Sequence, residues 1–383
     1  MTTSTVRVTA LAVALLLVAV VPLAPGVQAA GAGGCSFPLN TVDATGTSVS
    51  VDAEPTEVVT LAPSAAQTMW EIGAKGKVVG VSTNADYLSG TSSLTSITTY
   101  PAVDAETVVN LDPDLVLAPN AVSDEDVERL RSLGLTVYKF EEASTVEDVY
   151  AKTRLTGRLV GACDGADATV ADMKADVEAV REAVEGRERP PVFYHMGGGW
   201  TAGSDTFIHE IITTAGGENV GATAGISFYQ VISSEVLVSQ DPEWFVRGSV
   251  SVPSTSPYSD TTAGKENQVV VVNSNYMNQP APRIVYPIEA IAEALHPGVE
   301  IDLGGEGGVN ADLTGDAPTF ESAVTADGER SVAVSGLYTS RTARLTFPED
   351  ADGAVAVRSI ELTLREPNPS FLLTVADGST AES

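Results

Sequence analysis

An internal repeat constrains the fold of this chain more than any other feature of its sequence. Residues 106–117 (ETVVNLDPDLVL) match residues 235–246 (EVLVSQDPEWFV), with a glutamate six residues before an Asp-Pro-acid turn and an apolar run after it. Upstream of each copy, at 58–81 and 192–221, an apolar run is followed by a loop, a helical stretch and a Val-Gly pair. Two matching pairs in the same order predict two lobes of like construction.

Each lobe reads as alternating strands and helices. The later strands are expected at residues 135–140 and 269–273, and helices at 145–161 and 283–295. Valine-rich strands separated by helices form parallel sheets that are covered by helices. The sequence therefore predicts an α/β fold with two Rossmann-like lobes.

A segment without glycine or proline lies between the lobes. Residues 168–185 carry Ala, Val, Met, Glu and Arg at helical spacing, and Gly186 followed by Pro190 and Pro191 ends the pattern. A single long helix between the lobes is a stiff strut that permits only small opening and closing. The predicted domains are a signal peptide at 1–29, an N-terminal extension at 30–57, an N-terminal lobe at 58–165, a bridging helix at 166–187, a C-terminal lobe at 188–297 and a β-rich appended domain or stalk at 298–383.

The two ends of the chain differ from the lobes. An apolar run from Val8 to Leu23 follows the single charge of Arg7, and Val27-Gln28-Ala29 resembles a cleavage site. This pattern predicts export, so the protein works outside the cytoplasm, secreted or attached to the cell surface; an uncleaved anchor is the alternative. Beyond Pro297, alternating runs at residues 330–337, 342–347, 355–364 and 371–375 predict a small all-β segment.

The chain has only two cysteines, Cys35 and Cys163. Outside the cytoplasm an even pair favours a disulfide, which would join the mature N-terminus to the middle of the chain. The alternative is a lipid attached to Cys35, because Gly33-Gly34-Cys35 faintly resembles a lipoprotein cleavage site. We expect the disulfide.

Charge excludes some partners. The chain has 51 acidic and 21 basic side chains, which gives a net charge of −30. Such a surface repels nucleic acid and anionic lipid. It suits very high salt, where screening reduces the self-repulsion, and it predicts a halophilic protein.

Motifs for catalysis are missing from the sequence. The chain contains no G-x-S-x-G, P-loop, H-E-x-x-H or C-x-x-C motif, and the glycine-rich run at 197–203 lacks dinucleotide spacing. Of its three histidines, His209 and His296 are expected to be structural, whereas His195 ends a strand and could touch a ligand. We therefore expect a binding protein with neither a metal nor a cofactor. The alternative is a metalloenzyme or hydrolase on a two-lobed scaffold, with His195 in its site.

Aromatic side chains gather in the loops at the carboxyl ends of the predicted strands, where ligands bind in open α/β sheets. Flat rings on both sides of a cleft suit a large planar or apolar ligand, and the alternative is that they only cap the sheets. Arg283 is the one cation expected in these loops. The aromatic candidates are Tyr87, Tyr100, Tyr194, Trp200, Phe228, Tyr229 and Tyr276.

Residues 54–297 resemble the periplasmic-type binding proteins for vitamin B12 and iron–siderophores, which feed ABC importers. The resemblance rests on VVTLAPS at 58–64, VGVS at 79–82, LDPDLV at 111–116, GGEN at 216–219, SEVL at 234–237 and Pro282-Arg283. It implies two lobes bridged by one helix, a monomer, and a ligand in the cleft between the lobes.

The resemblance also implies that one glutamate on each lobe docks onto arginines of the permease dimer. Glu106 and Glu235, the glutamates of the repeat, occupy the matching positions. Paired carboxylates that meet cations give orientation and association rate more than affinity. The alternative is that both glutamates only stabilise helix N-termini.

The cleft loops contain few arginines, which favours cobalamin over a ferric siderophore as the ligand. A further alternative is that the chain is a structural surface protein. Tyr87 and Tyr100 match aromatic pocket positions of the B12-binding members, Trp200 matches one more loosely, and Asn120 replaces an aromatic residue. The segment after Pro297 is absent from those members and resembles the stalk of surface-anchored binding proteins of halophilic archaea. The full set of expected ligand residues is Pro63, Tyr87, Tyr100, Asn120, Tyr194, His195, Trp200, Phe228, Tyr229, Tyr276 and Arg283.

Overall fold

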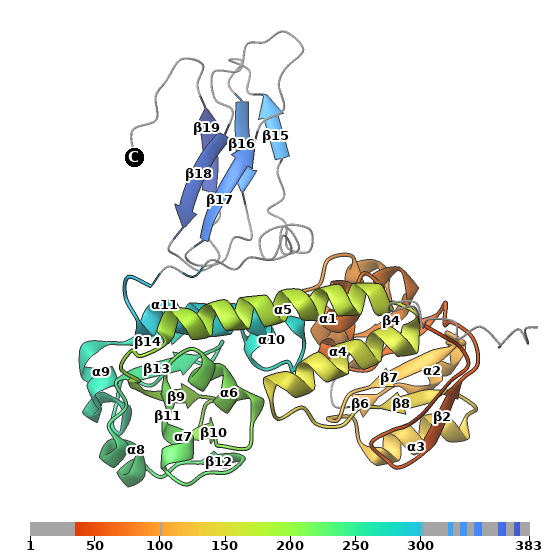
Figure 1. The fold of residues 1–383 in the computed structure, drawn as a ribbon, viewed down its shortest axis with the longest axis horizontal. Coiled ribbons are helices and arrows are strands. Elements are labelled where there is room, and N and C mark those ends of the chain that lie inside the picture. Colours follow the sequence, from red (N-terminus) through yellow and green to blue (C-terminus); the bar gives the residue numbers. More distant parts are fainter. Residues whose placement is uncertain are drawn as a thin grey trace, which may run out of the picture. The chain divides into compact units, whose positions relative to one another are not determined.

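The apolar runs form two parallel sheets, one in each half of the chain, in this computed structural model (Figure 1). The structure describes residues 35–99, 102–299 and 301, together with the backbone of five strands between 321 and 375. The export segment at 1–29 and Tyr100 lie outside the described residues.

The N-terminal sheet has the strand order β6-β5-β4-β3-β7-β8, and all its neighbouring strands are parallel except β5 and β6. Side chains on both faces of β3 and β7 are buried, so helices must cover both faces. Val58 and Leu115 pack towards α1 and α4, whereas Val59 and Val116 pack towards α2 and α3. The elements are β3 (Val58–Thr60), α1 (Pro63–Glu71), β4 (Val78–Ser82), β5 (Thr95–Thr99), β6 (Ala102–Val103), α2 (Ala105–Asn110), β7 (Leu115–Ala118), α3 (Asp124–Ser132), β8 (Val137–Lys139) and α4 (Val146–Val160).

The C-terminal sheet has the order β11-β9-β13-β14 and is parallel throughout. A short antiparallel ribbon, β10 with β12, stands beside it. One face of the sheet packs on α6 and α11, and the other on α8 and α9. The elements are β9 (Pro191–His195), β10 (Trp200–Ala202), α6 (Phe207–Thr214), β11 (Glu218–Asn219), α7 (Val220–Thr223), β12 (Tyr229–Val231), α8 (Ser234–Gln240), β13 (Trp244–Arg247), α9 (Thr262–Glu266), β14 (Val269–Val271), α10 (Ser274–Met277), the 3-10 turn η5 (Pro282–Ile284) and α11 (Val285–Leu295).

The repeat in the sequence is a repeat in the structure. The order β4-β3-β7-β8 corresponds to β11-β9-β13-β14, and Val58 pairs with Leu115 as Val192 pairs with Trp244. The Asp-Pro-acid turn makes the same kind of backbone bond in both lobes. The acid's N–H donates to the carbonyl of the residue before Val58 in one lobe and of the residue before Val192 in the other, at 2.9 Å each time. The prediction of two like lobes is confirmed.

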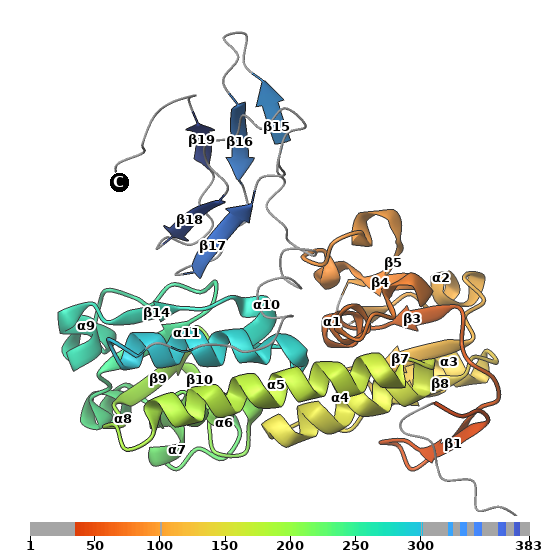
Figure 2. The same ribbon diagram turned by 45° about the horizontal axis from the view of Figure 1, so that its top comes forward.

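Helix α5 (Cys163–Val184) joins the two lobes as one unbroken helix and packs along α4 and α11 (Figure 2). Near its start Ala166 is buried in the core of the N-terminal lobe, and from Val170 to Val184 its buried apolar residues belong to the core of the C-terminal lobe. The helix begins before the predicted residue 166. Gly165 does not break it; a Cβ there would lie 2.2 Å from the Ile72 carbonyl oxygen, so glycine is required for close packing.

The strands after Pro297 form two antiparallel sheets, of order β15-β16-β19 and β17-β18. The described residues between 321 and 375 are all in strands, as the sequence predicts, and include one strand that was not expected, at 321–324. The strands are β15 (Glu321–Val324), β16 (Arg330–Val334), β17 (Arg341–Thr346), β18 (Ser359–Leu364) and β19 (Phe371–Val375). Among the described residues, no helix is both long and apolar enough to cross a membrane.

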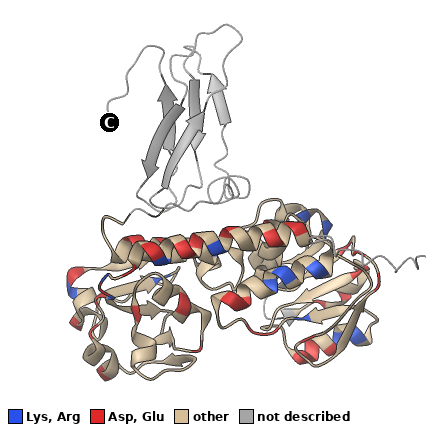
Figure 3. Ribbon diagram, in the orientation of Figure 1, with Lys and Arg blue, Asp and Glu red and all other residues tan. Residues whose placement is uncertain are grey.

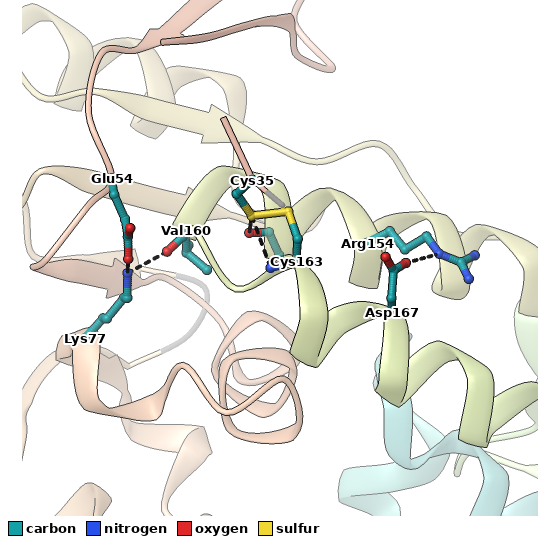
Figure 4. Close-up of a disulfide and its surroundings, with 8 residues drawn as sticks. Cys35, Glu54, Lys77, Arg154, Val160, Cys163 and Asp167 are labelled. Atoms are coloured by element: carbon teal, nitrogen blue, oxygen red, sulfur yellow. Dashed lines mark hydrogen bonds and ion pairs between the residues drawn. A yellow bond between two sulfur atoms is a disulfide. The ribbon is translucent and has the colours of Figure 1, made fainter. Parts of the chain in front are cut away.

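The N-terminal extension is tied to the first lobe at several points. Cys35 forms a disulfide with Cys163, the first residue of α5, as predicted (Figure 4). The Lys77 ammonium donates to Glu54 at 2.5 Å and to the Val160 carbonyl at 2.7 Å, which joins the extension to the end of α4. Between these points lies the hairpin of β1 (Leu39–Val42) and β2 (Ser48–Val51).

We expect the double variant Cys35→Ser/Cys163→Ser to lower the free energy of unfolding by about 2–5 kcal/mol. The two cysteines are 128 residues apart, and cross-linking so long a segment removes much entropy from the unfolded chain. Urea titration in molar KCl measures the loss. Reductant should reproduce it in the wild type and change nothing in the variant, and an unchanged midpoint would contradict the stabilising role.

Candidate ligand-binding site

The strand order of each lobe defines where a ligand is expected. The first strand of each parallel sheet lies between two later strands, in β4-β3-β7 and in β11-β9-β13, and ligands of open α/β sheets bind at the carboxyl ends beside such a switch point. Pro63 comes shortly after β3 and begins α1, Asn120 follows β7, and His195 is the last residue of β9. Three predicted residues therefore lie at or beside the carboxyl ends of switch-point strands.

Two predicted tyrosines, one from each lobe, meet. The rings of Tyr87 and Tyr276 pack edge to face with centroids 6.2 Å apart. Tyr87 is half-buried and follows β4, whereas Tyr276 lies in α10 and is 3% exposed. The structure thus brings aromatic side chains together across the lobes.

The other aromatic group belongs to the β10–β12 ribbon. Trp200 pairs in register with Val231, and both are 48% exposed; Phe228 is 46% exposed and packs edge to face on Tyr229. Large apolar side chains in such a group usually mark a binding surface. The preceding glycine-rich run is the turn from β9 to β10: Gly197, Gly198 and Gly199 all have positive φ, which glycine adopts without strain.

Tyr194 and His195 are interior residues. Each is 2% exposed, and the Tyr194 hydroxyl donates to Asn278 at 2.7 Å. The His195 ring packs against Tyr258 at 5.1 Å, and burial lowers the pKa of this imidazole, so it is neutral. Their contact with a ligand stays a prediction.

Arg283 has partners within the protein. It is 3% exposed, and its guanidinium donates to Glu71 at 2.8 Å and to the Tyr276 hydroxyl at 3.0 Å. A second cation at a strand end was not predicted. Arg247 is the last residue of β13 and pairs in register with His195 of β9. The repeat could have indicated its position, because Arg247, like Ala118 in the other lobe, directly follows the repeated apolar run and so lies at a strand end.

The two glutamates of the repeat occupy equivalent positions. Glu106 is the second residue of α2 and Glu235 the second residue of α8, and both are exposed. Asp104 and Ser233 cap these helices by accepting a backbone N–H. Within the described part of the chain neither glutamate has an ion-pair partner, so both carboxylates face solvent with their charge uncompensated.

Acidic side chains occur on helices of both lobes and along α5 (Figure 3).

Lys152 of α4 is a buried cation. Its ammonium is buried 5.5 Å from the centre of the Phe140 ring and has no hydrogen-bond partner among the described residues. Burial lowers the pKa of Lys152 to about 8.

Among the residues that the structure describes, no group of three or more His, Cys, Asp or Glu is placed to hold a metal ion.

Comparison with known proteins supports the shared architecture. The periplasmic binding protein family matches residues 58–276. "Cobalamin-binding protein" of Halobacterium salinarum is 45% identical over 293 residues, which cover 73% of this chain and 79% of that protein. "Vitamin B12-binding protein" of Vibrio parahaemolyticus is 24% identical over 254 residues, covering 64% and 92%.

Solved structures share the fold. The periplasmic vitamin B12 binding protein BtuF of Vibrio cholerae superposes with a TM-score of 0.56 and 20% identity, covering 63% of this chain and 96% of that one. The periplasmic heme-binding protein RhuT from Roseiflexus sp. RS-1 gives 0.57 and 22%, covering 63% and 99%. Neighbours with different ligands have the same two-lobed architecture.

We expect Lys152→Met to raise the free energy of unfolding at pH 7 by about 1–3 kcal/mol, because a pKa lowered from 10.5 to about 8 means that the folded state disfavours the charged form. The unfolded wild type binds more protons between pH 8 and 10.5, so its stability rises with pH there and that of the variant does not. Urea titrations at pH 7 and 9.5 measure both effects.

Lys174→Met is the matched control, because the Lys174 ammonium also lies over an aromatic ring, that of Tyr150 at 5.0 Å, but its side chain is 47% exposed. The control should change stability little. Equal effects of the two variants would contradict the cost of burying Lys152.

Proposed function

The chain belongs to the periplasmic binding protein family, and from this premise we propose that it captures cobalamin outside the cytoplasm and delivers it to an ABC import permease. The observation that carries the proposal is the 45% identity to the Halobacterium cobalamin-binding protein, which covers 73% of this chain. In this proposal the protein is a monomer and not an enzyme, and residues 1–29 direct its export.

The chemistry of the candidate site fits this ligand. Cobalamin presents a broad corrin ring with neutral amide side chains, so its binding needs apolar and aromatic surface more than cations. Trp200 and Phe228 offer such surface on the β10–β12 ribbon, and the half-buried Tyr87, packed against the buried Tyr276, offers it between the lobes. Arg283 is already neutralised by Glu71, which disfavours a highly anionic ligand.

Titration of the purified protein with cyanocobalamin in molar KCl tests the function. We expect one-to-one binding with a Kd between micromolar and nanomolar, or about 8–12 kcal/mol. A hydroxamate siderophore and haem serve as comparison ligands and should bind weakly. A folded protein that binds one of these instead, or none of the three, would overturn the proposal.

Replacing Trp200 by Ala should weaken cyanocobalamin binding about ten- to a hundredfold, because a half-exposed indole supplies a large contact area. Val238→Ala on α8 is the matched control, since Val238 is also exposed, at 38%, and lies outside the proposed site. Isothermal titration of both variants decides the point. Unchanged affinity for Trp200→Ala would remove the ribbon from the site.

The exposed pair Glu106 and Glu235 is proposed to dock onto arginines of the permease. Replacing both by Ala should leave the Kd for cyanocobalamin unchanged and abolish uptake by cells, because docking lies outside the ligand site. Glu188→Ala, which removes an exposed acid between α5 and β9, should affect neither. Loss of ligand affinity in the double variant would show that these glutamates have another role.

A further inference from the structure

Two segments of the C-terminal lobe contact helix α1 of the N-terminal lobe. Figures 1 and 2 both place α10 beside α1, and η5 also contacts this helix. Gln67, in the middle of α1, is fully buried, and its side-chain amide both accepts and donates a hydrogen bond. Its oxygen accepts from the Arg283 backbone N–H at 3.0 Å, and its nitrogen donates to the Tyr87 hydroxyl at 2.9 Å. One side chain thus joins the lobes and orients a tyrosine.

An ion pair lies next to this amide. Arg283 donates to Glu71, one helical turn after Gln67, and the two side chains are only 4% and 14% exposed. The same guanidinium donates to the Tyr276 hydroxyl and lies over the Tyr276 ring, 5.3 Å from its centre. Because the pair is buried, molar salt screens it far less than an exposed pair. This contact can therefore persist at the high salt that the composition indicates.

Tyr87 and Tyr276 are each fixed at the ring and at the hydroxyl. Their rings pack edge to face, while Gln67 holds one hydroxyl and Arg283 holds the other. A tyrosine with a packed ring and a bonded hydroxyl has little rotational freedom. The orientation of this aromatic pair therefore depends on the same groups that join the lobes.

We propose that Gln67, Glu71 and Arg283 form an interlobe latch that sets the distance between the lobes and, by fixing Tyr276 against Tyr87, positions the more exposed Tyr87 for the ligand. The positioning half of this inference rests on the proposed function. In this proposal the three residues act through the tyrosines and the lobe spacing, so Arg283, which the sequence predicts as a ligand contact, is instead a positioning residue. The latch adds polar contacts at α1 to the covalent connection through α5.

A double-mutant cycle tests the positioning role. Gln67→Leu should weaken cyanocobalamin binding about tenfold in the wild type, and less than about twofold when Tyr87→Phe has already removed the hydroxyl. The second cycle combines Arg283→Lys with Tyr276→Phe. Lysine keeps the positive charge but lacks the guanidinium group that donates to both Glu71 and the Tyr276 hydroxyl. Thermal unfolding of each variant reports its folding. Equal losses in both backgrounds would overturn the positioning role.

The lobe spacing is measured without ligand. Spin labels at Ser132→Cys in α3 and Ser239→Cys in α8, both exposed, report the distance between the lobes, and the native cysteines are protected by their disulfide. We expect Gln67→Leu to broaden and lengthen the distance distribution. Arg154→Gln is the control, because it breaks an exposed ion pair with Asp167 between α4 and α5 (Figure 4).

An unchanged distribution in Gln67→Leu, or the same change in Arg154→Gln, would overturn the latch. A wild type that binds no cobalamin would instead overturn the proposed function, and the distance measurement would still decide whether the latch exists.

Discussion

The arrangement of the two lobes depends on the burial of one helix in two hydrophobic cores. The side chain of Ala166 near the start of α5 packs in the N-terminal core, and the buried apolar side chains between Val170 and Val184 pack in the C-terminal core with α6 and α11. A helix held in this way cannot rotate relative to either sheet without exposing apolar surface, at about 25 cal/mol per Å². Helix α4 strengthens the connection, since Val146 and Val149 near its start pack in the C-terminal core.

Polar contacts between the lobes add to this apolar connection. The Glu210 carboxylate of α6 accepts from the Val146 N–H at the start of α4 at 2.6 Å, where a negative charge is favoured by the helix dipole. Gln67 and Arg283 join α1 to the segment before α11. These contacts are directional, so they can define one spacing of the lobes where apolar packing alone would tolerate several. The aromatic side chains from both lobes meet at the point where this spacing is defined.

Features that depend on local pattern were predictable from the sequence. The repeat indicated which strands correspond, and the strands β3, β7, β9 and β13 lie within one residue of the apolar runs that predicted them. The compositional change after Pro297 predicted the all-β segment, and the two cysteines predicted their disulfide. The predicted start of the bridging helix was wrong by three residues, because α5 begins at Cys163 and includes Gly165, where only a residue without a side chain fits against α1 and its end. The ligand residues, the docking glutamates and the export signal stay predictions.

The sequence by itself therefore determined the two lobes, the bridging helix and the class of side chain at the strand ends, since periodicity and spacing act over a few residues. Only the tertiary structure decided which of these side chains are accessible. Tyr194 and Trp200 are both aromatic residues near the end of β9, yet one is 2% and the other 48% exposed. Arg283 is paired with Glu71, a residue 212 positions away. Such a partner follows from the packing of η5 against α1, and packing between distant segments leaves no periodic trace in the chain.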